Sequence, residues 1–448
     1  MNVLMVKSFW DRQLNQMREG GFPVLWHKLK IFSKKLVELP ILLLSFLIVT
    51  PFVIIIRILK PVIWIRFGFF LTTRIGHFSF DVEYYLIERK LGLQPKKAFD
   101  LFFLSSLNTP ILESFNLQSA YNHGKPANTF FAKMCSRHVR SKNWASILFF
   151  VNHWLPGGSS HELLPPMRRV KSRDMKGLFQ QIEPQLYFSK EETLNGQDFL
   201  EEIGFKYGDK FVCLIVRDSG YLNTILLDKE TNWEYHNFRD TDIDTYEKAA
   251  LALAEKGYWV FRMGKVVREP FKADHPNILD YANSNYRSDF LDIWLMANCF
   301  FCITTGTGLD EISKIFRKPL VFVNYLPIET FMTPYCTITL LKHLVWQNTK
   351  KRLTLLEHLD NSYSRSEDYE KAEILIEDLN AEEIRHAVLE LEARLSGTWI
   401  DYKEDKLLQD KFWNLFKVHK DFYNFHDRIH PKARIGTSFL KENPEWLN

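Results

Sequence analysis

Two glycines and several hydroxyl groups cluster in the run Thr304-Thr-Gly-Thr-Gly-Leu-Asp-Glu311, which follows an apolar segment. Gly306 and Gly308 would let backbone amides approach a phosphate, and the hydroxyls of Thr305 and Thr307 would add donors. The helix that we expect next would contribute the positive end of its dipole. The run matches neither the Walker loop nor the dinucleotide fingerprint. Taken alone it is compatible with a phosphate site and with an ordinary tight turn.

Arginines stand at the ends of two other predicted strands. Arg217 stands in Val216-Arg-Asp-Ser-Gly-Tyr221, and Arg262 opens Arg262-Met-Gly-Lys265. A guanidinium can hold a diphosphate through two parallel hydrogen bonds, which a lysine cannot do. An ion pair of Arg217 with a neighbouring acid is the structural alternative. Together with the glycine run, the arginines predict a diphosphate site, which we expect to include Asp218, Ser219, Gly220, Gly264, Lys265, Thr305, Gly306, Thr307 and Gly308.

Polar and aromatic residues end the next strand and open the helix after it. In Asp280-Tyr-Ala-Asn283, the carboxylate could accept a hydrogen bond from a base or ribose, and Tyr281 could stack on the base. Turn and capping chemistry is the alternative for each of these residues. The donor-pocket contacts that we predict here are Asp280, Tyr281, Asn283, Ser288, Asp289 and Glu311.

A histidine lies close to the first strand, in Arg74-Ile-Gly-His77. We predict that His77 lies near the acceptor hydroxyl as a general base, and that Asp81 or Glu83 orients or replaces it. A purely structural histidine is the alternative. The sequence contains no HExxH motif, no histidine cluster with metal-ligand spacing and no GxSxG elbow. We therefore predict no metal site and no cofactor.

Composition and charge limit the class of protein. The chain has 448 residues, a net charge of +4 and 46% hydrophobic residues, which is typical of a globular protein with about two to three domains. The excess of basic residues lies within the first 74 positions, so the remainder is net acidic. That distribution disfavours a nucleic-acid partner. The five cysteines are scattered, which favours a reduced compartment over a disulfide framework.

An uncharged apolar run extends from Leu39 to Ile56. It is close to the short limit of about 17 to 25 residues for a membrane span, and Pro51 would kink a helix there. Lysines and arginines on both sides predict that both ends are cytoplasmic. We expect a bent, re-entrant or interfacial anchor in preference to a full span or a buried helix. The protein would then contact the cytoplasmic face of the inner membrane through residues 36–70.

The elements that position these residues form two α/β halves. Strands are predicted at 62–73, 98–105 and 146–151 in the first half, with a helix at 78–90. The second half alternates strands with helices, which predicts a parallel sheet. Its strands are expected at 211–216, 258–263, 277–281, 300–304 and 320–324, and its helices at 246–255, 288–298 and 309–316. A helical pattern at 369–395 begins an aromatic and polar tail that we also expect to be helical.

This pattern predicts four regions in the chain. They are a basic, apolar anchor at 1–65, an acceptor domain at 66–200, a donor domain at 201–370, and C-terminal helices at 371–448 that pack back across the domains.

Several short motifs together resemble a bacterial family of surface-polysaccharide glycosyltransferases. The motifs are Val-Arg-Asp-Ser-Gly-Tyr at 216–221, Arg-Asp-Thr-Asp-Ile at 239–243, Gly-Tyr-Trp-Val-Phe-Arg-Met-Gly at 257–264, Asp-Tyr-Ala-Asn-Ser at 280–284, Tyr-Arg-Ser-Asp-Phe at 286–290, Thr-Gly-Thr-Gly-Leu at 305–309, Arg-Ile-Gly-His at 74–77 and Ala-Arg-Ile-Gly at 433–436. The chain is also distantly similar to fucosyltransferases in the position of Arg217. The resemblance implies a GT-B arrangement, in which two Rossmann-like domains face each other and the second binds the nucleotide-sugar.

Residues and resemblance together predict a metal-independent glycosyltransferase, of hexosyl or deoxyhexosyl type, in polysaccharide biosynthesis of the bacterial cell envelope. Arg217, Arg262 and the glycine run would stabilise the leaving diphosphate. The partners would be a nucleotide-sugar and a glycan acceptor, which an anchored enzyme could meet as a lipid-linked glycan. A nucleotide-sugar epimerase, a polyol-phosphate transferase of the same fold and a membrane-tethered scaffold without catalysis are the alternatives.

Overall fold

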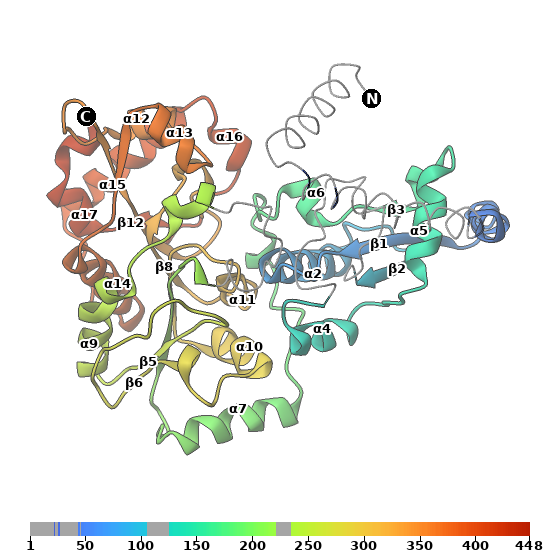
Figure 1. The fold of residues 1–448 in the computed structure, drawn as a ribbon, viewed down its shortest axis with the longest axis horizontal. Coiled ribbons are helices and arrows are strands. Elements are labelled where there is room, and N and C mark those ends of the chain that lie inside the picture. The colour runs from blue at the N-terminus through green and yellow to red at the C-terminus, as the bar shows by residue number, and fades with distance from the viewer. Residues whose placement is uncertain (1–21, 23–25, 27–43, 45, 105–124, 221–233) are drawn as a thin grey trace. The chain divides into compact units, whose positions relative to one another are not determined.

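The computed structural model describes residues 22, 26, 44, 46–104, 125–220 and 234–448 (Figure 1). Close contacts group the chain into two compact units, and each is described by itself. Unit 1 comprises Met1–Phe67, Lys97–Leu101 and Asn143–Leu163, and unit 2 comprises Gly68–Lys96, Phe102–Lys142 and Leu164–Asn448.

A seven-stranded parallel sheet forms the centre of unit 2. Its order among the described residues is β12-β9-β8-β7-β4-β5-β6. The strands are β4 (Phe211–Ile215), β5 (Trp259–Arg262), β6 (Ile278–Leu279), β7 (Cys302–Thr304), β8 (Leu320–Tyr325), β9 (Thr337–Leu341) and β12 (Arg434–Ile435). The α/β class and the five strands predicted in this half are confirmed. β9 and β12 were not foreseen, and β12 comes from the tail that we expected to be helical.

The order in which the chain adds strands to the sheet reverses at β4. From β4 the chain adds β5 and then β6 on one side, and it returns to add β7 against the other side of β4, with Cys213 opposite Cys302. The carboxyl ends of β4 and β7 therefore flank the topological switch point, where open α/β sheets bind ligands. Arg217 follows β4, and the glycine run follows β7.

Helices cover both faces of this sheet. Figure 1 shows α9 (Glu247–Glu255) and α14 (Ala381–Ser396) on one side, and α10 (Asp289–Asn298) and α11 (Asp310–Ile315) on the other. Ser288 caps α10 by accepting a hydrogen bond from the Leu291 amide at 3.1 Å, as its sequence position predicts. The three predicted helices are confirmed, although α9 begins after the short 3-10 helix Ile243–Tyr246.

α2 (Ile75–Lys90) packs against α11 within unit 2. A Cβ atom on Gly76 would lie 3.1 Å from the Cα of Gly308, so the start of α2 and the glycine run meet where neither carries a side chain. Phe78 and Phe80 are fully buried in this helix. The predicted helix is confirmed, but it starts three residues earlier, which places His77 in its first turn.

The remaining elements of unit 2 are mostly short. They are α4 (Thr129–Ser136), α6 (Pro166–Val170), Leu178–Gln180, α7 (Lys190–Glu202), Glu234–Arg239, Tyr281–Asn283, Ile328–Thr330, β10 (His343–Trp346), α12 (Leu355–Asp360), α13 (Ser366–Lys371), β11 (Ile374–Glu377), α15 (Lys403–Val418), α16 (Phe422–Phe425), α17 (Thr437–Glu442) and Pro444–Leu447. The continuous helix predicted at 369–395 is wrong, because β11 interrupts it. Its apolar residues pair antiparallel with β10, which local periodicity does not show.

Unit 1 contains a helix at 46–58, a small sheet and α5 (Ala145–Trp154). The sheet order is β2-β1-β3, with β1 (Trp64–Phe70), β2 (Ala98–Leu104) and β3 (Glu162–Leu163). The 3-10 helix Gly158–His161 directly precedes β3 in the chain. β1 and β2 run on into unit 2. The strand predicted at 146–151 is wrong, because those residues belong to α5. An uncharged apolar run does not distinguish a strand from a buried helix by periodicity alone.

The structure describes only part of the predicted anchor. The structure describes residues 44 and 46–56 of the apolar run, and the rest lies outside the described residues. The helix continues through Pro51 to residue 58. In the described part of the chain, no helix combines the length and the apolarity that crossing a membrane requires.

Candidate active site at the switch point of the sheet

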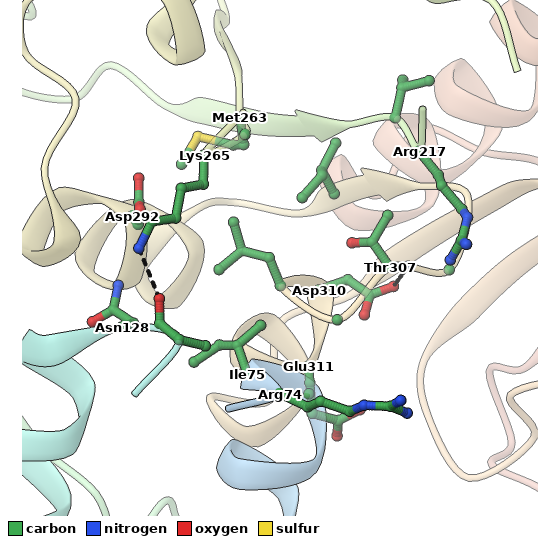
Figure 2. A pocket seen from close by; sticks show the side chains of 18 of the residues that line it. Arg74, Ile75, Asn128, Arg217, Met263, Lys265, Asp292, Thr307, Asp310 and Glu311 are labelled. Carbon is green, nitrogen blue, oxygen red and sulfur yellow. Dashed lines mark hydrogen bonds between the residues drawn. The ribbon is translucent and has the colours of Figure 1, made fainter. Parts of the chain in front are cut away.

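A cavity of about 520 Å³ lies in unit 2 at the carboxyl ends of the strands (Figure 2). Its size falls in the range of small-molecule sites, roughly 300 to 1,000 Å³. The predicted site residues that line it are His77, Arg217, Asp218, Gly264, Lys265, Gly306, Thr307, Gly308 and Glu311. The structure thus brings together residues of four separate loops that the sequence analysis linked only by their positions at strand ends.

Two arginines line the cavity beside the glycine run. Arg217 donates from Nε to Asp240 at 3.1 Å, and its amide donates to the Thr305 hydroxyl at 3.0 Å. Arg239 donates to the Gly306 carbonyl, and its Nε is buried without a hydrogen-bond partner among the described residues. No ion pair of Arg239 is found in that part of the chain. Burial, and then the nearby charge of Arg217, lower the pKa of Arg239.

The glycine run is organised by its own side chains. The Gly306 amide donates to the Thr304 hydroxyl at 3.0 Å, and the Thr307 amide donates to Asp310 Oδ2 at 3.0 Å. Two amides that we expected to face a phosphate are therefore occupied. The Thr307 hydroxyl is buried and has no partner among the described residues. Donors for an anion in this part of the cavity are hence the threonine hydroxyl and the arginines.

The start of α2 offers a second set of donors. Its N-cap Arg74 and its first residues, Ile75 to His77, line the cavity, and no side chain among the described residues caps the helix. The first turn carries no acidic residue. Because the first amides of a helix lack partners within it and carry the positive end of its dipole, this end favours an anion. α2 has sixteen residues, whereas α11 has only six, so the dipole of α2 is the larger.

A buried group of charges forms another wall. Lys314 is 4% exposed and bonds Oε2 of Glu311, while Asp310 lies 3.8 Å away from the same ammonium. Glu311 Oε1 and Asp310 Oδ1 have no hydrogen-bond partner among the described residues. Burial raises the pKa of Glu311 to about 7, although Lys314 opposes the shift. Figure 2 labels Asp310 and Glu311 among the residues that line the cavity.

His77 lies on the same wall as the start of α2. Its Nδ1 is hydrogen-bonded to the Ser172 hydroxyl at 2.8 Å, and Ser172 also lines the cavity. Lys171 and Ser172 both have a positive φ, at 53° and 52°, which is strained for residues other than glycine. Burial, and then Arg74, lower the pKa of His77 to about 4. The imidazole is therefore neutral at pH 7.

Arg262 does not line the cavity, although its sequence position matches that of Arg217. It is 1% exposed, pairs with Asp280 at 3.2 Å and lies 3.9 Å from Asp218. It also donates to the Glu269 carbonyl at 3.0 Å. Arg262 therefore bonds to other residues of the protein and does not face the cavity. Arg217 also forms the structural ion pair that we weighed for it, with Asp240 at 3.1 Å, but it lines the cavity as well.

The predicted nucleoside contacts lie outside the cavity lining, apart from Glu311. Tyr281 is fully buried, and its hydroxyl is hydrogen-bonded to Asp292 at 3.1 Å. Asn283 donates to Asp280, Ser288 caps α10, and Asp289 accepts from the Thr129 amide at 2.8 Å. These are the turn and capping roles that we weighed as alternatives. Ser219, Gly220 and Thr305 are likewise absent from the lining, although Thr305 holds the Arg217 amide.

Asp81 and Glu83 are buried on α2 and do not line the cavity. Asp81 accepts from the Met167 amide at 2.7 Å, and burial raises its pKa well above the usual range. Glu83 accepts from the Gln185 amide at 2.9 Å and pairs with Arg317 at 3.0 Å. Both carboxyls bond to residues of distant segments within unit 2.

Sequence reasoning assigned no site role to Arg74, Asn128, Ser172, Arg239, Asp310 or Lys314, all of which line the cavity. Arg74 and Arg239 stood in the motifs that carry the family resemblance, which was an available signal. Ser172 lies in a loop without a motif, so nothing local marked it. In the described part of the chain, no group of three or more histidines, cysteines, aspartates and glutamates is placed to hold a metal ion.

No protein-family model and no curated protein matches the sequence. Among solved structures, the chain is similar to an ADP-heptose LPS heptosyltransferase II from E. coli, with 13% identity and a TM-score of 0.33 over 62% of this chain and 90% of that one. It is also similar to a glycosyltransferase family 9 protein from Veillonella parvula, with 10% identity and a TM-score of 0.32 over 62% of this chain and 86% of that one. The similarity to a UDP-N-acetylglucosamine 2-epimerase has 8% identity and a TM-score of 0.27 over 76% of this chain and 98% of that one. At TM-scores this low, these likenesses assign the chain neither a family nor an activity.

Proposed function

We propose that the protein is a glycosyltransferase that binds the diphosphate of a nucleotide-sugar in this cavity and moves the sugar to a glycan acceptor. The observation that carries the proposal is Arg239. It is a half-buried cation on the cavity wall, beside Arg217, and it forms no ion pair in the described part of the chain. Asp240 and Asp310 favour its charge from nearby, but neither pairs with it directly, so its guanidinium can bind an anionic ligand in a cavity of ligand size.

A diphosphate fits the donors around the two arginines. Arg217 uses only Nε in its contact with Asp240, so its terminal nitrogens can reach a ligand. The buried Thr307 hydroxyl and the uncapped start of α2 offer further donors. When the bond between the sugar and the diphosphate breaks, negative charge develops on the leaving oxygen. Fixed positive groups that face this oxygen stabilise the transition state.

The acceptor hydroxyl must lose its proton, and Glu311 suits this task better than His77. A proton acceptor works best when its pKa lies near the working pH. The pKa of Glu311 is raised to about 7, whereas that of His77 is lowered to about 4. In the proposed step, the carboxylate takes the proton, the acceptor oxygen bonds to the anomeric carbon, and the diphosphate leaves with the electron pair. His77, held by Ser172, would orient the acceptor by hydrogen bonding.

The test is product analysis with the full chain, a panel of nucleotide-sugars and glycan acceptors, including lipid-linked ones. Transfer of the sugar, which Arg217→Ala abolishes and Arg268→Ala leaves intact, would support the proposal. Arg268 is a matched control because its side chain is 69% exposed and lies outside the cavity. An epimerised nucleotide-sugar, or transfer of a polyol phosphate, would favour those enzymes instead. No turnover with any donor would favour the scaffold.

Three finer parts of the proposal have their own controls. Metal independence predicts that transfer survives a chelator. A hexosyl or deoxyhexosyl donor predicts turnover with those sugars in preference to others of the panel. A role in surface-polysaccharide synthesis predicts that a lipid-linked glycan is a better acceptor than the same glycan without its lipid.

A further inference from the structure

The helix at 46–58 in unit 1 exposes apolar side chains on most of its circumference. Soluble proteins rarely leave contiguous apolar surface of this kind uncovered. The exposed fractions are 72% for Leu47, 57% for Ile48, 59% for Phe52, 46% for Ile54, 53% for Ile55 and 70% for Ile58. The apolar surface continues beyond the helix with Leu59 at 42% and Val62 at 84%.

A narrow face of the same helix holds it to unit 1. Val53 is fully buried, and one turn later Arg57 donates to the Asn152, Leu155 and Pro156 carbonyls at 2.7 to 3.1 Å. These carbonyls lie at the end of α5, where a cation complements the helix dipole. A Cβ on Gly158 would lie 2.1 Å from the Asn152 carbonyl oxygen and 2.7 Å from the Arg57 guanidinium, so a larger residue there would disturb this contact. The helix therefore has a fixed place, and its apolar exposure is not a consequence of fraying.

α5 adds large exposed side chains within unit 1. Trp144 precedes it, Ile147 lies in its first turn, and Trp154 ends it, with exposed fractions of 54%, 44% and 61%. In Figure 1, α5 lies beside the blue helix at the edge of unit 1. Tryptophan is the residue most typical of membrane interfaces, because its ring is apolar and its N–H is polar.

The charges along the helix and the segment directly after it are positive. No aspartate or glutamate occurs from Leu39 to Phe80, whereas Arg57 and Lys60 follow the apolar run. The Lys60 ammonium lies 5.0 Å from the centre of the Trp64 ring. Apolar side chains bordered by cations and tryptophans complement a bilayer that contains anionic phospholipid. Binding to a second copy of this protein would not require that these charges all be positive.

We propose that helix 46–58 and the exposed residues of α5 bind a bilayer of anionic phospholipid. The surface lies in unit 1, whereas the cavity lies in unit 2, so this inference does not depend on the proposed activity.

The test is flotation of the full chain with vesicles of phosphatidylcholine and phosphatidylglycerol. The double variant Phe52→Glu and Ile55→Glu removes two large apolar contacts and adds repulsion from anionic lipid. We expect its vesicle-bound fraction to fall about tenfold or more, and that of Trp154→Ala to fall about threefold. The matched control is Tyr207→Glu with Tyr423→Glu, because these unit 2 side chains are 108% and 74% exposed. We expect the control to float like the wild type.

Circular dichroism confirms that each variant is folded, and nucleotide binding then separates a failure here from a failure of the proposed function. Equal flotation of the Phe52 and Ile55 variant and the wild type would overturn the proposal, as would absence of flotation in the wild type. A wild-type dimer that this variant converts to a monomer without any vesicle binding would also overturn it, and would assign the surface to self-association. Loss of binding to vesicles of phosphatidylcholine alone would support the role of the cations.

Discussion

Arg262 ends β5 and is 1% exposed, whereas Arg239 ends the 3-10 helix Glu234–Arg239 and is partly exposed, and the surroundings of the two arginines differ. Arg262 has two carboxylates and a carbonyl around it, and it does not line the cavity. Arg239 has the Gly306 carbonyl and no ion pair among the described residues, and it lines the cavity. A buried cation whose charge is balanced by the protein supports the fold. A cation on a cavity wall that no carboxylate contacts directly can bind an anion.

The carboxylates show the same contrast. Both oxygens of Asp280 are occupied, by Arg262 and by the Phe271 amide and the Asn283 side chain. Glu311 has one oxygen on Lys314 and another without a partner in the described part of the chain. The saturated groups hold loops together, whereas the unsaturated ones remain available for chemistry.

Removing the proposed proton acceptor should have the largest effect. Glu311→Gln keeps the shape of the side chain, and we expect kcat to fall about 10²- to 10⁴-fold with nucleotide binding retained. Asp280→Asn, the saturated counterpart, should lower stability more than kcat.

The pH dependence of the rate tests the same residue. Because the pKa of Glu311 is raised to about 7, its basic form is lost as the pH falls through 7. The wild-type rate should therefore rise with pH and level off above about 7. A limb near pH 4 would instead assign the proton to His77, whose pKa is lowered to about 4.

Replacing each of these two arginines by methionine should separate an effect on stability from an effect on ligand binding. Arg262→Met leaves Asp280 and Asp218 without their cation, and we expect a loss of about 3 kcal/mol in the free energy of unfolding. Arg239→Met removes a partly exposed charge that forms no ion pair among the described residues, so stability should change by less than about 1 kcal/mol. Urea unfolding measures both. Equal destabilisation by the two substitutions would contradict the contrast.

The same two substitutions should differ in ligand binding in the opposite sense, because here Arg239→Met has the larger effect. A hydrogen bond to a charged group contributes about 1.5 to 3 kcal/mol, so Arg239→Met should raise the Kd for the nucleoside diphosphate about 10- to 100-fold. Folded Arg262→Met should bind with nearly the wild-type Kd. Calorimetry distinguishes the two.

The smallest effect concerns the Thr307 hydroxyl. Thr307→Val removes one neutral donor of the cavity while nearly preserving volume, and we expect a Kd about 3- to 10-fold higher. Thr245→Val is the control, because that hydroxyl bonds the Asp242 carbonyl away from the cavity. An unchanged Kd in Thr307→Val would remove this hydroxyl from the proposed contacts.

The sequence predicted the strands from Phe211 to Tyr325 because each is a short apolar run between turn residues, and such runs are governed by local chemistry. It predicted Arg217 and the glycine run at one site for the same reason. It did not distinguish Arg217 from Arg262, because the balancing carboxylate of Arg262 becomes a neighbour only through the parallel pairing of β5 with β6. Ser172 and α5 were missed because their roles depend on contacts with segments far away in the chain.

The most direct test of the central claim is calorimetric binding of UDP, GDP, ADP and CDP to the full chain, with and without chelator. We expect one diphosphate to bind selectively, to survive the chelator, and to bind about 10- to 100-fold more weakly to Arg217→Ala but unchanged to Arg268→Ala. Absence of binding at millimolar nucleotide, or binding that Arg217→Ala leaves unchanged, would contradict a diphosphate site at the switch point of the sheet.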